Sequence, residues 1–267
     1  MTALHRMEPP PENAAQPDGA GTLGISVRDL ALRYGQNTIF EGLSFDIEPG
    51  HFVALLGSSG VGKTSLLKII AGLETAAAGS VVASDGGQVA SRIAYMGQQD
   101  LLYPWLTVRQ NVTLGARLRG EKPELERADH LLERVGLGKH ATALPMMLSG
   151  GMRQRAAIAR TLYEQRPFVL MDEPFSALDA LTRDAMGFEL LRLWQASPKT
   201  VMFITHSIPE AVLLADRVVV MSARPGGVIA DLPVPLGRPR DETSLRTAEM
   251  QDYMAHLRGL LIHKEIA

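Results

Sequence analysis

The sequence predicts an α/β protein with a mainly parallel sheet. Two observations predict this fold class. An apolar strand pattern at residues 51–57 runs through a glycine-rich turn into a good helix-forming stretch at 63–73, which is how a sheet covered by helices begins. Three apolar runs rich in β-branched residues, at 167–174, 200–206 and 216–223, then predict further buried strands.

The composition limits the functions that the chain can have. Its 267 residues carry 27 Lys and Arg against 29 Asp and Glu, a net charge of −2, so no overall basic field favours nucleic acid as a partner. There is no cysteine, which excludes disulfides and thiolate zinc sites. No apolar run reaches the roughly 18 residues of a membrane span. A cytosolic setting fits these observations.

The N-terminal part of the chain divides into a tail and strands. Residues 1–22 are rich in Pro, Ala and Gly and lack the apolar segment of a secretory signal, so we expect a disordered tail. Strand patterns at 25–34 and 38–50 predict an antiparallel hairpin that leads into the buried strand. One folded domain is expected to cover residues 23–231.

Helices are expected in two further places. A helical subdomain is predicted as an insertion at about residues 101–160, because residues 116–140 place apolar side chains three and four positions apart: Leu125, Ala128, Leu131, Leu132 and Val135. Residues 232–267 are predicted to form a C-terminal helical extension with an apolar stripe at Leu245, Met250, Met254, Leu257 and Leu261.

The glycine-rich turn has the pattern of a phosphate-binding loop. Residues 57–64 read G-x-x-x-x-G-K-T between a strand and a helix pattern, the context that this motif requires, so a chance glycine turn is the weaker interpretation. Lys63 supplies a cation for the outer phosphates, and Thr64 supplies a hydroxyl for Mg²⁺. The residues expected to bind the nucleotide phosphates are Gly57, Ser58, Ser59, Gly60, Val61, Gly62, Lys63, Thr64 and Ser65.

Two adjacent acids end the apolar run 168–171. A parallel strand delivers residues at its carboxyl end to the crevice where ligands bind. Asp172 is therefore expected to hold Mg²⁺, and Glu173 to polarise the attacking water.

A second glycine turn opens the helix pattern that begins near residue 150. Residues 148–155 read LSGGMRQR, and here the chain resembles the ATP-binding cassette (ABC) family, whose signature is LSGGQ. Met152 stands in place of the usual Gln, a variant similar to the importers of nitrate, sulfonates, taurine and hydroxymethylpyrimidine thiamine precursors. The resemblance implies a P-loop NTPase core of the ABC ATPase type, with an antiparallel β subdomain and an inserted helical subdomain.

The resemblance also implies roles for single residues. Tyr34 matches the aromatic residue that stacks on adenine, and His206 matches the histidine that contacts the γ-phosphate. Gln98 matches the glutamine that reaches Mg²⁺ and the water, although its neighbour Gln99 is an alternative. Residues expected to complete the partner subunit's ATP site are Ser149, Gly150, Gly151 and Asp179.

An apolar cluster follows Gln98. Leu101, Leu102 and Trp105 either contact a helix of a membrane subunit or pack inside the helical subdomain. The sequence leaves both interpretations open.

The resemblance therefore implies an importer ATPase that uses ATP and Mg²⁺. It implies a homodimer of ATPase subunits at the inner face of the cell membrane, separate permease subunits, and an indirect link to a substrate-binding protein. Three other classes fit the sequence less well. A small-molecule P-loop kinase would not explain residues 149–151, and an ABC protein of DNA repair or translation would normally show two cassettes or long coiled-coil insertions, which this sequence does not show. A scaffold that binds ATP without hydrolysing it would not need the intact Glu173 and His206. The resemblance implies that the transported molecule is a small nutrient of the nitrate, sulfonate, taurine or thiamine-precursor type, and it favours a pyrimidine thiamine precursor or a related nitrogen or sulfur nutrient.

Overall fold

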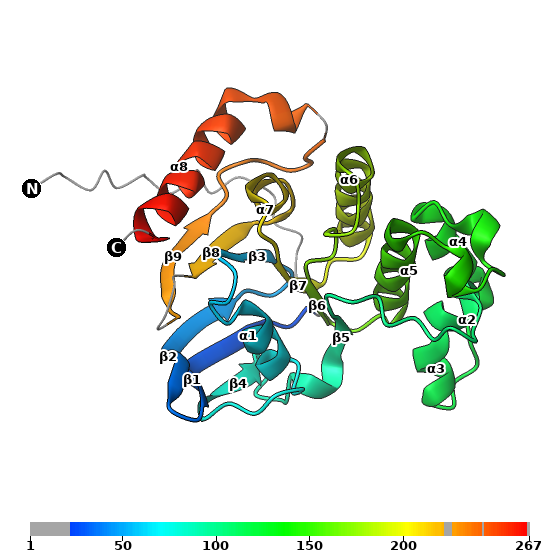
Figure 1. The fold of residues 1–267 in the computed structure, drawn as a ribbon, viewed down its shortest axis with the longest axis horizontal. Coiled ribbons are helices and arrows are strands. Elements are labelled where there is room, and N and C mark those ends of the chain that lie inside the picture. The colour runs from blue at the N-terminus through cyan, green and yellow to red at the C-terminus, as the bar shows by residue number, and fades with distance from the viewer. Residues whose placement is uncertain (1–21, 222–225, 242, 266–267) are drawn as a thin grey trace, which may run out of the picture.

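The chain folds into two sheets and a helical subdomain (Figure 1). The computed structural model describes residues 22–221, 226–241 and 243–265, so the tail predicted at residues 1–22 lies outside it except for Thr22. The strands are β1 (Ile25–Tyr34), β2 (Asn37–Ile47), β3 (Phe52–Gly57), β4 (Ala78–Ala83), β5 (Ile93–Met96), β6 (Phe168–Asp172), β7 (Thr200–Ile204), β8 (Arg217–Met221) and β9 (Val228–Pro233). The helices are α1 (Lys63–Ile70), α2 (Val108–Val112), α3 (Leu114–Leu118), α4 (Leu125–Arg134), α5 (Gly150–Tyr163), α6 (Ala180–Ala196), α7 (Ile208–Leu214) and α8 (Ala248–Glu265).

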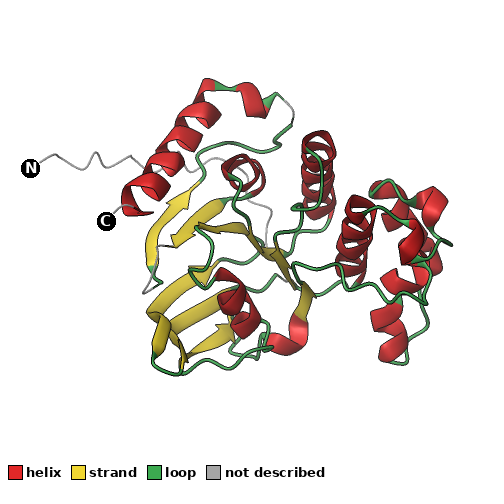
Figure 2. Cartoon of the chain, viewed as in Figure 1, coloured by secondary structure: helices red, strands yellow, loops and turns green. Residues whose placement is uncertain are grey.

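The larger sheet has six strands in the order β5-β6-β7-β3-β8-β9. All neighbours pair in parallel except β8 and β9, so β9 forms an antiparallel edge. Every residue of β3 is buried, because both faces of the sheet are covered. Phe52, Ala54 and Leu56 pack toward the helical side, whereas Val53 and Leu55 pack toward α1 and the smaller sheet. Figure 2 shows these layers.

The smaller sheet is antiparallel, in the order β2-β1-β4. The hairpin predicted from residues 25–50 is present as β1 and β2. The third strand, β4, was not predicted, because its sequence AGSVVA is short and mostly exposed and lacks an alternating apolar pattern.

The helical subdomain contains α2 to α5. The apolar spacing that begins at Leu125 forms the amphipathic helix α4 and buries Ala128, Leu131 and Leu132, but the helix does not extend over the whole of residues 116–140. The chain leaves α3 at Leu118 and enters α4 at Leu125. Gly120, at φ +75°, and Pro123 interrupt the pattern. The residue expected at the start of the stripe, Leu125, is 52% exposed.

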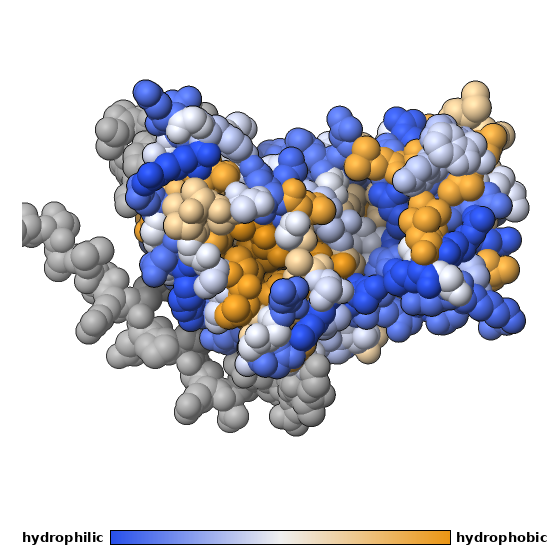
Figure 3. Space-filling view, turned by 90° about the horizontal axis from the view of Figure 1, so that it is seen from below, coloured by the Kyte–Doolittle hydropathy of each residue, from blue (hydrophilic) through white to orange (hydrophobic). Residues whose placement is uncertain are grey.

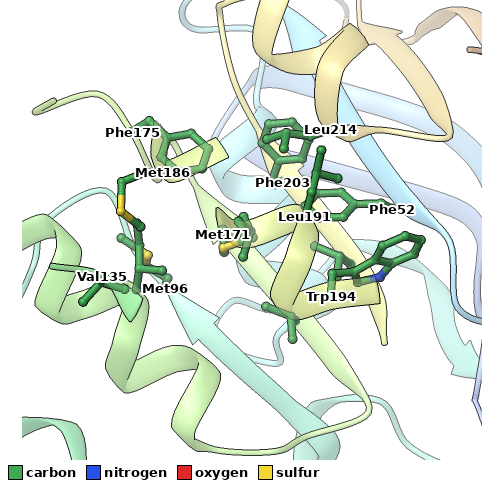
Figure 4. Packing of buried hydrophobic residues seen from close by; sticks show 14 of the residues in the cluster. Phe52, Met96, Val135, Met171, Phe175, Met186, Leu191, Trp194, Phe203 and Leu214 are labelled. Atoms are coloured by element: carbon green, nitrogen blue, oxygen red, sulfur yellow. The ribbon is translucent and has the colours of Figure 1, made fainter. Parts of the chain in front are cut away.

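Aromatic rings fill the centre of the core (Figure 4). Phe52 makes edge contacts with Phe203 and Trp194, at centroid distances of 5.4 and 5.8 Å. Helix α8 packs against α7 and buries members of the predicted stripe, namely Met250, Met254 and Leu257. The Leu245 side chain lies outside the described part. No helix in the described ranges is long and apolar enough to cross a bilayer.

Candidate nucleotide-binding and hydrolysis site

Four neighbouring strands bring the predicted site residues to one edge of the larger sheet. In the strand pairing, Met96 lies opposite Met171, and Ile204 lies opposite both Asp172 and Leu55. The segments that leave β5, β6, β7 and β3 therefore start at the same level, and these segments hold Gln98, Glu173, His206 and the phosphate loop. This is the carboxyl edge, where open α/β sheets bind ligands.

The phosphate loop turns tightly around the Lys63 ammonium. Lys63 is 8% exposed, and its Nζ donates to the carbonyl oxygens of Gly57 and Ser58, both at 2.7 Å. Gly62 caps α1 at φ +99°, and a Cβ there would lie 2.7 Å from Ile39 Cγ2. Glycine is thus required by both backbone conformation and space. Backbone N–H groups at the start of α1 remain available to an anion.

Asp172 fits a magnesium site. The residue is 1% exposed, and its Oδ2 has no hydrogen-bond partner among the described atoms. Burial raises the pKa of Asp172, while a hydrogen bond from Thr64 and the charge of Lys63 oppose that rise. A buried carboxylate oxygen without a partner beside a threonine hydroxyl matches the oxygen ligands of Mg²⁺. Among the described residues, no group of three or more His, Asp or Glu side chains is arranged to hold a metal ion without other ligands.

Glu173 is held in a strained conformation next to His206. Its φ is +49°, which is unusual for a residue other than glycine and is found at functional sites. Its Oε1 lies 3.5 Å from Nδ1 of His206. Gln154 Nε2 and Ser176 Oγ donate to the Glu173 carbonyl oxygen at 3.4 and 3.1 Å. The backbone is thereby fixed while the carboxylate stays 21% exposed, as a general base for water requires.

Tyr34 stands beside the phosphate loop. It is 51% exposed, and its hydroxyl lies 3.4 Å from Oγ of Ser65 and donates to the Glu74 carboxylate. The hydrogen bond to Glu74 raises the pKa of Tyr34. An exposed aromatic ring at this place can stack on a base.

The two segments expected at a dimer interface, at Ser149 and at Asp179, are the exposed N-terminal ends of α5 and α6. Ser149 caps α5 and accepts from the Met152 N–H at 3.2 Å, and Asp179 caps α6 and accepts from the Thr182 N–H at 3.0 Å. The hydrogen bond from the Thr182 backbone lowers the pKa of Asp179. Within the described residues, no hydrogen bond or ion pair joins either segment to Lys63.

Comparisons with known proteins agree with this geometry. Residues 40–176 match the family described as ABC transporter. The chain belongs to the ABC transporter ATP-binding family. An uncharacterised ABC transporter ATP-binding protein of Methanocaldococcus jannaschii is 47% identical over 78% of this chain and 80% of its own length. The aliphatic sulfonates import ATP-binding protein SsuB 1 of Pseudomonas fluorescens is 42% identical over 91% of this chain and 90% of its own.

A solved structure shows the same fold. It is a dimeric, post-hydrolysis ATP-binding cassette bound to ADP and phosphate, with a TM-score of 0.70 and 28% identity over 79% of this chain and 98% of its own. The chain is thus an ABC ATPase with a P-loop NTPase core, as predicted.

In this ABC ATPase, Arg153 and Arg160 of α5 both contact the segment at Asp100 and Leu101, which the sequence did not reveal. Arg153 Nε lies 3.0 Å from the Asp100 carboxylate, and its Nη1 donates to the carbonyl oxygen of Leu148 at 3.0 Å. Arg160 donates to the backbone oxygens of Asp100 and Leu101 at 2.6 and 2.9 Å. Helix α5 therefore ties the segment after Gln98 to the signature loop. The only sequence signal is the seven-residue spacing of two arginines on one helix, which names no partner.

The cluster after Gln98 divides into exposed and buried side chains. Trp105 is 70% and Leu101 65% exposed. On the face seen in Figure 3, apolar side chains lie at several places over the helical subdomain, beside a larger apolar area nearer the middle of the molecule. Of the two interpretations left open for Leu102, internal packing holds and contact with a membrane subunit does not, because Leu102 is 9% exposed and packs in the core. Gln98 and Gln99 are both exposed, and the choice of Gln98 stays a prediction.

Proposed function

We propose that this chain is the ATP-hydrolysing subunit of an importer whose membrane-spanning subunits are separate chains. The observation that carries the proposal is the strained Glu173 beside His206, one residue after the buried Asp172. Two copies would sandwich two ATP molecules, with the exposed Ser149 and Asp179 of one copy facing the phosphate loop of the other. The dimeric solved cassette supports this arrangement.

Each group has a role in hydrolysis. Loop N–H groups and Lys63 bind the outer phosphates, and Lys63 must release its two carbonyl contacts to do so. Thr64, Asp172 and Gln98 would hold Mg²⁺, which neutralises charge on the phosphates. Glu173 accepts a proton from the attacking water, and His206 orients that carboxylate and reaches the γ-phosphate. Tyr34 stacks on the adenine.

We propose a small anionic nutrient of the aliphatic sulfonate type as the transported molecule. The name of the Pseudomonas fluorescens relative supports this choice, and nitrate, taurine and thiamine precursors are the alternatives. The exposed Leu101 and Trp105 would contact the permease, which places the chain peripherally on the inner face of the cell membrane. A substrate-binding protein would act on the other side.

The experiment uses Glu173→Gln, with Glu126→Gln on the exposed face of α4 as the matched control. Loss of the base should lower the ATPase rate by about 10²- to 10⁴-fold, equal to about 3–5 kcal/mol of barrier. ATP binding should persist, so the variant should elute as a dimer with ATP in size-exclusion chromatography. Adding Ser149→Arg should abolish that dimer. Near-normal turnover of Glu173→Gln would remove Glu173 from its role, and a dimer that persists in the double variant would contradict the sandwich.

A further inference from the structure

A cavity of about 530 Å³ is lined by α4 and α5 of the helical subdomain, by α6 and by strands of the larger sheet. It opens at the amino ends of β6 and β7, the edge opposite to the nucleotide site, because Pro167 and Lys199 line it and directly precede these strands. Its wall is mainly apolar and includes Phe52, Leu131, Val169, Leu190 and Trp194. Cavities that take small molecules have volumes of about 300–1,000 Å³ and similar walls.

The charged residues of the cavity all have the same sign. Arg127, Arg166 and Lys199 line it, and no Asp or Glu does. Lys199 Nζ donates to the Arg166 carbonyl at 3.3 Å, and Arg127 donates to the Leu162 carbonyl at 3.2 Å. Among the described residues, none of the three cations forms an ion pair with a carboxylate within 4.0 Å.

This positive charge is unfavourable in the free protein. Burial lowers the pKa of Lys199, and the nearby charge of Arg127 lowers it further. Burial also lowers the pKa of Arg127. Arg127 lies over the Tyr163 ring at 5.1 Å, and Lys199 donates to the Arg166 carbonyl, but neither contact supplies the negative charge that would offset the lost hydration. An anion with an apolar body would satisfy both parts of the cavity, since its charged head would meet the three cations and its body would cover the aromatic wall.

We propose that this cavity is a binding site for a small organic anion, with one sulfonate, carboxylate or phosphate head on an apolar body of about six to ten carbons. The site goes beyond the proposed function, because it is separate from the ATP site and needs no nucleotide. An anion here would contact both Arg127 of α4 and Lys199 before β7, and would therefore link the helical subdomain to the sheet.

The test uses Trp194 as the reporter. The chain has two tryptophans, so the full chain with Trp105→Phe reports on Trp194 alone, whose indole donates to the Lys199 carbonyl at 2.8 Å. The probe is 1-octanesulfonate, titrated without nucleotide. We expect a saturable change in emission with a Kd below about 1 mM. Ethanesulfonate, which lacks the body, and 1-octanol, which lacks the charge, should each bind at least about tenfold more weakly.

Variants of the cations identify the site. Lys199→Met and Arg166→Gln should each weaken 1-octanesulfonate binding by about tenfold or more, whereas Lys139→Met, an exposed lysine outside the cavity, should leave it unchanged. Lys199→Met removes a poorly solvated charge, so its melting temperature should not fall. Absence of saturable binding, equal binding of octyltrimethylammonium, or unchanged affinity in both cavity variants would overturn the proposal.

One further variant tests an occupant from the chain itself. The segment before Thr22 carries Glu8, Glu12 and Asp18, and Thr22 lines the cavity. A full chain with Glu8→Gln, Glu12→Gln and Asp18→Asn should bind 1-octanesulfonate as the parent does. A tenfold gain in affinity in this variant would assign the cavity to the N-terminal carboxylates and overturn the proposal of a free anion.

Discussion

Two glycines of the phosphate loop allow backbone strain to be separated from steric fit. Gly60 and Gly62 both have positive φ, +81° and +99°. A Cβ at Gly60 would meet nothing within 4 Å, whereas a Cβ at Gly62 would lie 2.7 Å from Ile39 Cγ2 and 3.1 Å from Phe40 Cδ1. Phe40 is fully buried and Ile39 is 9% exposed, so neither side chain can move into solvent.

The two alanine substitutions should therefore differ in cost. Gly60→Ala adds only the strain of a positive φ, about 1–2 kcal/mol. Gly62→Ala adds the same strain and an overpacked contact worth about 1–3 kcal/mol. For a chain of this size each kcal/mol lowers Tm by about 2–4 °C, so Gly62→Ala should melt about 2–12 °C below Gly60→Ala.

Thermal melts without nucleotide measure this difference, because bound ATP would stabilise the variants unequally. Far-UV circular dichroism at low temperature checks that both variants fold. Equal melting temperatures for the two variants would refute the reasoning, since they would mean that the space around Gly62 does not limit its side chain.

Four further predictions concern single side chains. Lys63→Ala should lose the stabilisation by Mg-ATP, which is about 2.7 kcal/mol at 100 times the Kd; thermal shifts with and without Mg-ATP check this. Trp105→Ala should change the unfolding free energy by less than about 0.5 kcal/mol, because the side chain is 70% exposed, yet weaken co-purification with the membrane subunits; a loss of several kcal/mol would show that Trp105 is core. Arg240→Met should cost about 2–4 kcal/mol in urea unfolding, because it removes the donor to three carbonyl oxygens at the end of α7. Burial raises the pKa of Glu210 above its ordinary 4.5, so this group favours the folded state most at low pH and less as pH rises through the raised pKa. Glu210→Gln, which can still accept from Thr205, should therefore gain Tm relative to the wild type between pH 4.5 and 7, and the opposite trend would contradict the sign.

The sequence predicted the place of the glycine-rich loop between β3 and α1, because the constraints on that loop are local. Gly62 and Lys63 belong to one contiguous motif between a strand and a helix, and the backbone geometry that they need depends on few distant residues. The acids at the end of β6 were predicted for a similar reason, since the carboxyl ends of parallel strands share one edge.

Contacts between distant segments were not predictable in the same way. Leu102 and Trp105 have similar apolar character and are three residues apart, and only the tertiary packing decides that one is buried and the other exposed. The ion pair of Arg153 with Asp100 spans 53 residues, and nothing in the local pattern of either residue indicates its partner. The break between α3 and α4 could have been predicted from the sequence. Gly120 and Pro123 indicate a helix end there, but the apolar spacing of the following residues was given more weight.

The contacts between α5 and Asp100 mean that a rotation of this helix would also move the segment that contains Asp100. The 14 residues of α5 give a rod of about 21 Å at 1.5 Å per residue, with Ser149 at one end. A rotation of about 10° about the far end would displace Ser149 by about 4 Å. Because Arg153 and Arg160 are bonded to the segment that leads to Trp105, that segment would move together with the helix. Under the proposed function, the two arginine contacts would carry the movement of α5 to that segment, and shortening either side chain should weaken the coupling between ATP hydrolysis and uptake.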